Sequence, residues 1–148
     1  MTIPSTTLPK DYQPETGLLR DRVILVTGAG QGLGRVAAMA FARHGAAVIL
    51  HGRNVAKLEA VYDAIESEGL SQPAILPLDF AKVTQAELEA FAQSIHGTMR
   101  RLDGIFHGAS HFVSPMPMAL HDRDMWMQHA RVNLAVPAAL TKACMPLR

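Results

Sequence analysis

The octapeptide Thr27-Gly28-Ala29-Gly30-Gln31-Gly32-Leu33-Gly34 decides the fold, because it joins a short apolar run to a segment with helical periodicity. Glycine is needed in such a turn where the backbone angles forbid a Cβ and where an anion must approach the main chain closely. A helix that begins at the end of the turn presents unpaired N–H groups and the positive end of its dipole. The flanking strand and helix patterns favour a phosphate-binding loop over a glycine-rich turn that binds nothing.

The segments around this loop alternate between strand and helix patterns. We expect strands at 23–26, 47–50, 74–78 and 104–107. We expect helices at 33–44, at 54–68, at 84–99, and from Asp122 or Asp124 to about 147. Continuous apolar runs are typical of buried parallel strands, and short connections place successive strands in one sheet. The sequence therefore predicts an α/β fold, an incomplete Rossmann-type doubly wound parallel sheet of about four strands in the order 3-2-1-4.

Capping signals support two of these helix starts. Asn54 can cap the second helix, and Thr84 followed by Glu87 has the Ser/Thr-x-x-Glu form of a capping box. Gly45 and Gly69 stand where the first two helices should end, at the position where a left-handed residue closes a helix.

Bulk composition places the chain among globular proteins. It has 148 residues, 49% of them apolar, with a net charge of +1 at pH 7. One domain suits this length, and the near-neutral charge gives no reason to expect nucleic acid as a partner. No run approaches the roughly 18 apolar residues of a membrane span, and a single cysteine favours a reducing, cytoplasmic location. We expect a flexible tail at 1–20, where prolines oppose regular structure, and a nucleotide-binding domain at 21–148.

The glycine-rich turn also carries a resemblance to a known family. Thr27, Gly28, Gly32 and Gly34 form the pattern Thr-Gly-x-x-x-Gly-x-Gly, which resembles the signature of the short-chain dehydrogenases/reductases. The resemblance runs from about Leu18 to Leu147. Within the family, the sequence is similar to the bacterial YciK-like oxidoreductases. It implies a nicotinamide dinucleotide cofactor and hydride transfer between a small carbonyl or alcohol substrate and that cofactor. The implied cofactor-binding residues of the turn are Thr27, Gly28, Gly30, Gln31, Gly32, Leu33 and Gly34.

The end of the second strand bears on the choice between NADP and NAD. An acidic residue there accepts hydrogen bonds from a free ribose 2′-hydroxyl, whereas a basic residue pairs with a 2′-phosphate. The sequence has Arg53 at this place and no carboxylate nearby, so NADP is favoured and NAD stays possible. A solvated arginine at a helix start is the plain alternative. Asp79 matches the position that contacts adenine in the family, although an Asp that caps a turn fits equally well.

The turn after the fourth strand departs from the family pattern, whereas an asparagine in the last helix matches it. Gly108, Ala109 and Ser110 stand where the family usually has Asn-Ala-Gly. Gly108 and Ala109 are still expected beside the cofactor, a bracing amide is lost, and Ser110 should have φ below zero. Asn133 matches the asparagine that the resemblance assigns to a proton relay, and it is the one expected catalytic residue present.

The rest of the family's catalytic set is absent from these 148 residues. The family uses a serine and a Tyr-x-x-x-Lys motif, in which the tyrosine supplies the proton. The two tyrosines, Tyr12 and Tyr62, are followed four residues later by Thr16 and Glu66. We therefore expect the cofactor-binding half of an oxidoreductase, cut before its catalytic half and inactive alone. A non-catalytic nucleotide-binding or partner-binding module is the alternative.

Two expectations concern other partners. The segment after Asp124 is apolar on several faces, so we expect it to be buried in a homo-oligomer or to cause self-association. The seven histidines show no metal-ligand spacing, since His107 and His111 are four apart on a strand and a loop rather than on a helix. No metal site is therefore expected.

Overall fold

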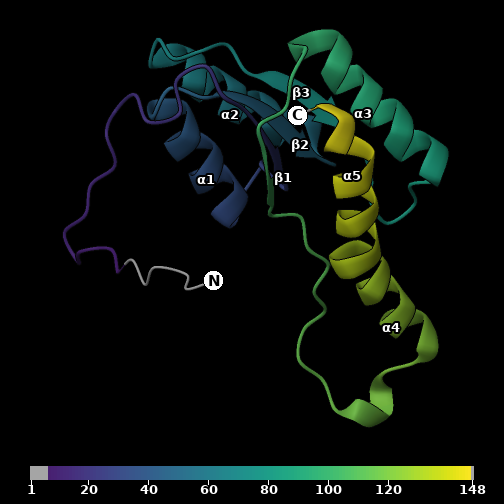
Figure 1. The fold of residues 1–148 in the computed structure, drawn as a ribbon. Helices are drawn as coiled ribbons and strands as arrows, with labels where there is room; N and C mark the ends of the chain where they lie inside the picture. Colours follow the sequence, from purple (N-terminus) through teal and green to yellow (C-terminus); the bar gives the residue numbers. More distant parts are fainter. Residues whose placement is uncertain (1–6, 148) are drawn as a thin grey trace, which may run out of the picture.

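A computed structural model describes residues 7–147 of the chain. Its sheet contains β1 (Val23–Thr27), β2 (Ala47–Gly52), β3 (Ala74–Pro77) and β4 (Gly104–His107), all parallel and ordered β3-β2-β1-β4 (Figure 1). The register sets Leu25 of β1 between Ile49 of β2 and Ile105 of β4. The predicted doubly wound sheet and its strand order are confirmed.

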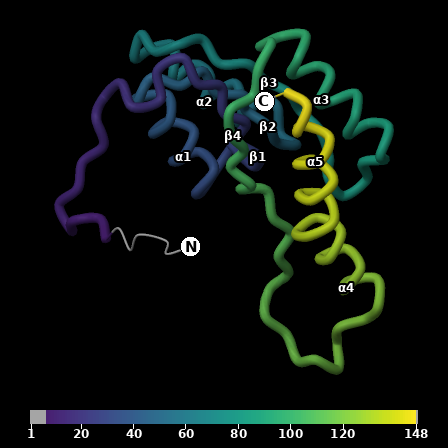
Figure 2. Tube along the Cα trace, viewed as in Figure 1, coloured from purple at the N-terminus to yellow at the C-terminus, as the bar shows by residue number. Residues whose placement is uncertain are grey.

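Helices cover both faces of the sheet. The first half of the chain supplies α1 (Gly32–Arg43) and α2 (Val55–Ser67), and the second half supplies α3 (Gln85–Met99) and α5 (Val136–Cys144). The tube in Figure 2 shows α1 and α2 on one side of the strands, with α3 and α5 on the other. The α4 helix (Arg123–Ala130) extends away from the sheet, beyond a long loop that contains the short turn η1 (Met118–Leu120).

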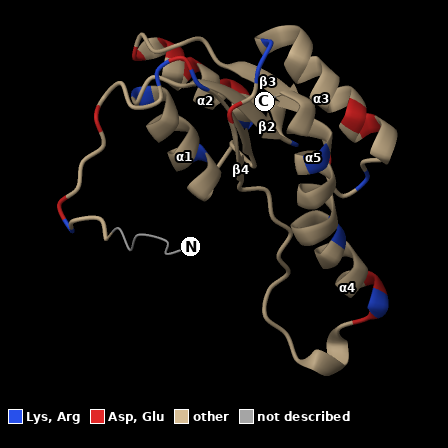
Figure 3. Ribbon diagram, viewed as in Figure 1, with Lys and Arg blue, Asp and Glu red and all other residues tan. Residues whose placement is uncertain are grey.

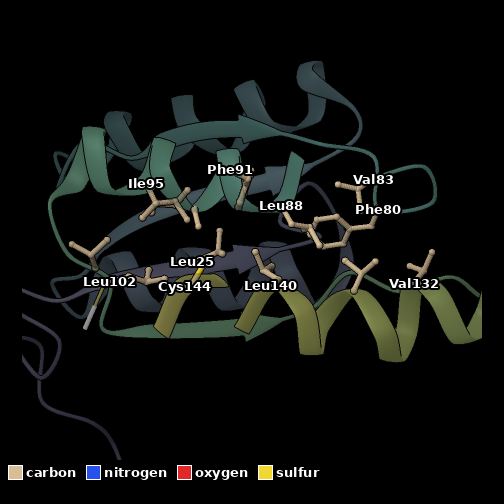
Figure 4. Packing of buried hydrophobic residues seen from close by; sticks show 14 residues of the cluster. Leu25, Phe80, Val83, Leu88, Phe91, Ile95, Leu102, Val132, Leu140 and Cys144 are labelled. Atoms are coloured by element: carbon tan, nitrogen blue, oxygen red, sulfur yellow. The ribbon is translucent and has the colours of Figure 1, made fainter. Parts of the chain in front are cut away.

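Two apolar layers hold these elements together. Along β1, the side chains of Leu25 and Val26 point to opposite faces, so each face of the sheet has its own core. Figure 4 shows the layer under α3 and α5, where Leu25 meets residues such as Phe91 and Leu140. Strands that are apolar on both faces belong in the middle of such a three-layer arrangement, which explains the continuous apolar runs.

The predicted helix ends are confirmed in most places. Asn54 accepts a hydrogen bond from the N–H of Lys57 at 3.1 Å, and Thr84 and Glu87 form a reciprocal capping box. Gly45 and Gly69 have φ values of 102° and 70°, a left-handed conformation that costs other residues steric strain. Asp122 caps α4 through the N–H of Met125 at 2.8 Å, which settles the choice between Asp122 and Asp124.

The last helix is not the single α-helix that the sequence predicts. A π-helical turn, η2 (Arg131–Ala135), separates α4 from α5, and a final turn, η3 (Met145–Leu147), follows. An α-helix would use the N–H of residue 137 to bond the carbonyl of Asn133, but residue 137 is a proline and has no N–H. Pro137 therefore accounts for the widened turn immediately before it.

The chain begins to contact the domain just before β1. Leu19 donates its N–H to the carbonyl of His44 at 2.9 Å and packs against the layer under α1 and α2. Residues 1–6 of the expected tail, and Arg148 at the other end, lie outside the described residues. The division into a tail and one domain stays a prediction.

Candidate functional site

A cleft of about 360 Å³ opens at the carboxyl ends of the strands. Ligands of open parallel sheets bind at this edge, where loops from neighbouring strands diverge. Of the residues predicted from the sequence, ten line the cleft: Gly28, Gly30, Gln31, Gly32, Leu33, Gly34, Arg53, Asp79, Gly108 and Ala109. Thr27 and Asn133 do not line it, although each braces a loop that does.

The turn after β1 brings its main chain close to its neighbours at two glycines. A Cβ on Gly34 would lie 2.0 Å from the carbonyl oxygen of Gly28, so the first turn of α1 can sit on the loop only without a side chain. Gly28 has φ of 65°, and a Cβ there would lie 2.8 Å from the N atom of Ala109. Glycine at these two positions therefore lets the loop pack closely against α1 and against the turn after β4.

The first turn of α1 is open to an anion. Among the described residues, no side chain caps this helix: its N-cap residue, Gln31, makes no capping hydrogen bond, and no acidic residue lies in the first turn. The free N–H groups and the helix dipole therefore offer partial positive charge to the cleft.

Two cationic side chains line the cleft beside this turn. Arg53 follows β2, and Lys57 comes from the first turn of α2. The Lys57 ammonium donates a hydrogen bond to the side-chain carbonyl of Gln31, the residue before α1. Sequence reasoning did not single out Lys57. Its place three positions after the Asn54 cap predicts the first turn of α2, but not its contact with the phosphate loop.

Asp79 adopts the turn-capping geometry that its sequence position also allows. Its Oδ1 accepts a hydrogen bond from the N–H of Ala81 at 2.9 Å. The residue also lines the cleft.

His51 is a cleft residue that sequence reasoning did not single out. Its side chain lies at the end of β2, is 2% exposed, and stacks on the ring of Phe80 with centroids 4.0 Å apart. Burial lowers the pKa of His51 to about 4, although the hydrogen bond with the Leu78 carbonyl opposes the shift. The imidazole is therefore neutral at physiological pH. The signal was a polar residue that ends an otherwise apolar strand.

The turn after β4 rests directly on β1. Thr27 Oγ1 accepts a hydrogen bond from the N–H of Ala109 at 3.1 Å, and a Cβ on Gly108 would lie 2.6 Å from the Thr27 carbonyl oxygen. With this backbone no asparagine fits at 108, so the bracing comes from Thr27 instead. The expectation for Ser110 is confirmed, since Asp21 and Arg100 are the positive-φ residues other than glycine in the described part of the chain.

Asn133 braces the loop after β4 to the last helix. Its Oδ1 accepts from the His111 N–H at 2.7 Å, and its Nδ2 donates to the His111 carbonyl at 2.8 Å. These two hydrogen bonds resemble the pair that opposite residues exchange in a β-ladder. It joins η2 to the loop that runs from Gly108 along the cleft.

The described residues also bear on the requirements of a metal site and of a membrane span. Figure 3 shows acidic and basic residues distributed over several helices and loops. Within residues 7–147, no group of three or more His, Cys, Asp or Glu side chains is placed to hold a metal ion. No helix of the described part is both long and apolar enough to cross a membrane.

Comparisons with known proteins agree with this geometry. The family model for short chain dehydrogenases matches residues 22–147. The oxidoreductase YciK of Escherichia coli K12 is 43% identical over 136 residues, which cover 92% of this chain and 54% of that protein. The crystal structure of YciK from E. coli superposes with a TM-score of 0.87 at 43% identity, covering 93% of this chain and 56% of the other.

A second solved structure comes from Escherichia coli CFT073, described as a short chain dehydrogenase complexed with NADPH. It has a TM-score of 0.86 and 43% identity, and the match covers 90% of this chain and 56% of the other. The chain spans about half the length of the relatives it matches.

Proposed function

The chain belongs to the short-chain dehydrogenase family, and from this premise we propose that it binds NADP(H) as the cofactor-binding part of an oxidoreductase. The substrate class is a small carbonyl compound or the corresponding alcohol. When bound, the nicotinamide would accept or supply the hydride. The chain's own residues bind the dinucleotide and hold its ends in place.

The observation that carries this proposal is the charge at the 2′ side of the cleft. Arg53 and Lys57 both line it, and no carboxylate stands at the end of β2 to meet a free 2′-hydroxyl. A guanidinium and an ammonium offer several donors to a phosphate dianion. NADP is therefore preferred over NAD, and the NADPH complex of the similar E. coli protein supports this preference.

The glycine-rich loop supplies the second contact. Gly30 and Gly32 line the cleft, Gly32 has open space beside it, and the uncapped first turn of α1 fits a pyrophosphate. Leu33 at 80% exposure lies on the same rim, where an apolar side chain can cover the dinucleotide. Asp79 is proposed to accept a hydrogen bond from the adenine amine.

Catalysis would need groups that these 148 residues do not include. The sequence has no Tyr-x-x-x-Lys, so no side chain of the family's kind can donate the proton. Asn133 is the residue of this chain that we propose to serve the relay. We propose that Asn133 helps to hold a water in that relay, as the family resemblance implies. We propose that the 148-residue chain alone does not turn over.

The missing motif also favours a second candidate, a nucleotide-binding module without catalysis. Turnover distinguishes the two. The chain is titrated with NADPH and then assayed at 340 nm with simple aldehydes and ketones. The same assay is repeated after supplying a segment that carries the Tyr-x-x-x-Lys motif of a relative. Binding with reduction restored by the segment supports the oxidoreductase. Binding without restoration supports the module, and absence of NADPH binding contradicts both.

The last helical segment is proposed to contact a second copy of the chain. Four of its large apolar side chains are more than half exposed: Trp126 at 52%, Met127 at 56%, Leu134 at 70% and Met145 at 52%. Several large apolar side chains exposed on one segment are consistent with an interaction surface. We also propose a reducing, cytoplasmic setting, because Cys144 is a buried free thiol.

A further inference from the structure

His51 connects three strand ends through one buried ring. Its Nδ1 lies 3.3 Å from the N atom of Gly28, at the start of the phosphate loop. Its Nε2 lies 2.9 Å from the carbonyl oxygen of Leu78, just after β3. We propose that His51 is a positioning residue for the cofactor, which fixes the main chain of the phosphate loop relative to the adenine side of the cleft. This inference rests on the proposed NADP(H) binding.

Hydrogen-bond accounting assigns the form of the ring. The Gly28 N–H can only donate, so Nδ1 must carry a lone pair. The Leu78 carbonyl can only accept, so Nε2 must carry the proton. The neutral Nε2–H tautomer is the one form that satisfies both partners. A cationic ring would direct an N–H at the N–H of Gly28.

The main chain reinforces the same connection. The carbonyl of His51 accepts from the Ala29 N–H at 2.8 Å, so two successive amides of the phosphate loop are tied to one residue. On the other side, Leu78 donates its N–H to the carbonyl of Gly52 at 3.2 Å. Hydrogen bonds therefore join β2 to the phosphate loop on one side and to the chain after β3 on the other, and the His51 side chain adds one bond on each side.

Packing keeps the ring in this orientation. Phe80 stacks on it with an interplanar angle of 15°, and Phe91 meets it edge-on at 5.8 Å. The ionisable side chains that share the cleft are Arg53, Lys57, Asp79 and His111. The ring partners themselves are aromatic or main-chain groups, so no carboxylate is paired with His51 to stabilise its cation. This environment agrees with the lowered pKa.

The link has a consequence for recognition of the cofactor. Because His51 accepts the Gly28 N–H, that amide is used inside the protein and is not a donor to the pyrophosphate. The donors left for the anion are those further along the turn and in the first turn of α1. His51 thus acts on the cofactor through the position of the loop rather than through contact with the reacting atoms.

Three substitutions separate the two hydrogen bonds. His51→Asn places an amide oxygen near the Nδ1 position and keeps an acceptor for Gly28. His51→Gln places an amide N–H near the Nε2 position and keeps a donor for Leu78. His51→Leu removes both and keeps an apolar side chain. NADPH affinity is measured for each by calorimetry, with melting temperature recorded in parallel.

The expected order of NADPH affinities depends on whether the variant keeps an acceptor for the Gly28 N–H. His51→Leu and His51→Gln should bind NADPH about tenfold more weakly than the wild-type chain, whereas His51→Asn should stay within about threefold. Equal affinities for wild type and all three variants would overturn the proposal, as would losses that follow the melting temperature rather than the acceptor. If the wild-type chain binds no NADPH, the proposed function fails and this inference fails with it.

A second measurement does not depend on the variants. Long-range ¹H–¹⁵N correlation spectra of the wild-type chain report the tautomer of each histidine. A neutral Nε2–H signal for His51 at pH 7, retained when NADPH is added, supports the assigned link. An Nδ1–H or a cationic ring at this pH would overturn it.

Discussion

Pro137 and Asn133 stand one helical turn apart, and the missing N–H of the proline leaves the asparagine carbonyl without its α-helical donor. The helix widens into the π-helical turn at this point. The Asn133 side chain then projects to the backbone of His111, to which it makes two hydrogen bonds. Pro137 therefore shapes the helix at this point, and Asn133 ties the helix to the loop that borders the cleft.

Replacement of Asn133 should loosen that loop. Asn133→Ala removes both hydrogen bonds to His111, and we expect a loss of about 1–2 kcal/mol in the free energy of unfolding. The His111 amide should exchange its hydrogen faster, because it loses its acceptor. Urea denaturation and hydrogen exchange measure these two effects. Asn133→Asp is the matched control, since it keeps the acceptor for the His111 N–H. Unchanged exchange at His111 in Asn133→Ala would contradict the bracing role.

Preference for NADPH should depend on both cations of the cleft. Arg53→Ala and Lys57→Ala should each weaken NADPH binding by about tenfold, because each removes charge-assisted donors from the 2′-phosphate. NADH, which has no 2′-phosphate, should be affected little. Arg123→Ala, at the start of α4 and away from the cleft, serves as the control for loss of charge. Equal losses for NADPH and NADH would show that these residues do not read the 2′-phosphate.

Stability should fall at moderately acidic pH because of His51. Its pKa is lowered from 6.5 to about 4 in the folded chain, so the folded state binds fewer protons than the unfolded state between these values. The free energy of unfolding is therefore unaffected by protonation of His51 above pH 6.5, and it decreases as the pH falls from 6.5 toward 4. The loss amounts to about 3 kcal/mol from this group. His51→Leu should lack this part of the pH dependence when unfolding is followed from pH 7 to pH 4. A pH profile identical to that of the wild type would contradict the buried neutral imidazole.

Self-association should depend on the last helical segment. Leu134 is 70% exposed, and Leu134→Glu should shift the chain toward monomer in sedimentation velocity runs, because a carboxylate opposes burial. Val36→Glu provides the control, since Val36 is an exposed apolar residue of α1. A wild-type chain that sediments as a monomer at all concentrations would contradict the proposed contact.

The strands and first helices follow from local sequence. Apolar runs such as 47–50 and capping residues such as Asn54 act over a few residues, so the pattern alone locates them. The π-helical turn was missed because apolar periodicity predicts a continuous helix, and the effect of Pro137 was not included in that prediction. The sequence shows that a proline lies within the helix. It does not show whether the helix bends, ends or widens into a π-helical turn there.

The site was less predictable than the fold. Glycine positions in the phosphate loop could be identified because only backbone geometry and an adjacent helix are involved. Lys57 and His51 could not be placed in the same way, since their roles depend on partners about 25 residues away in the chain, Gln31 and Gly28. Long-range side-chain contacts are set by the sheet register, which local patterns do not encode.

The central claim, that this cleft holds a dinucleotide with a 2′-phosphate, is tested most directly by the ratio of NADPH to NADH affinity. The two ligands are titrated into the wild-type chain by calorimetry under the same buffer and salt. We predict that NADPH binds at least about tenfold more tightly than NADH, and that the advantage shrinks as salt screens the phosphate. Equal affinities, or tighter binding of NADH, would contradict the account.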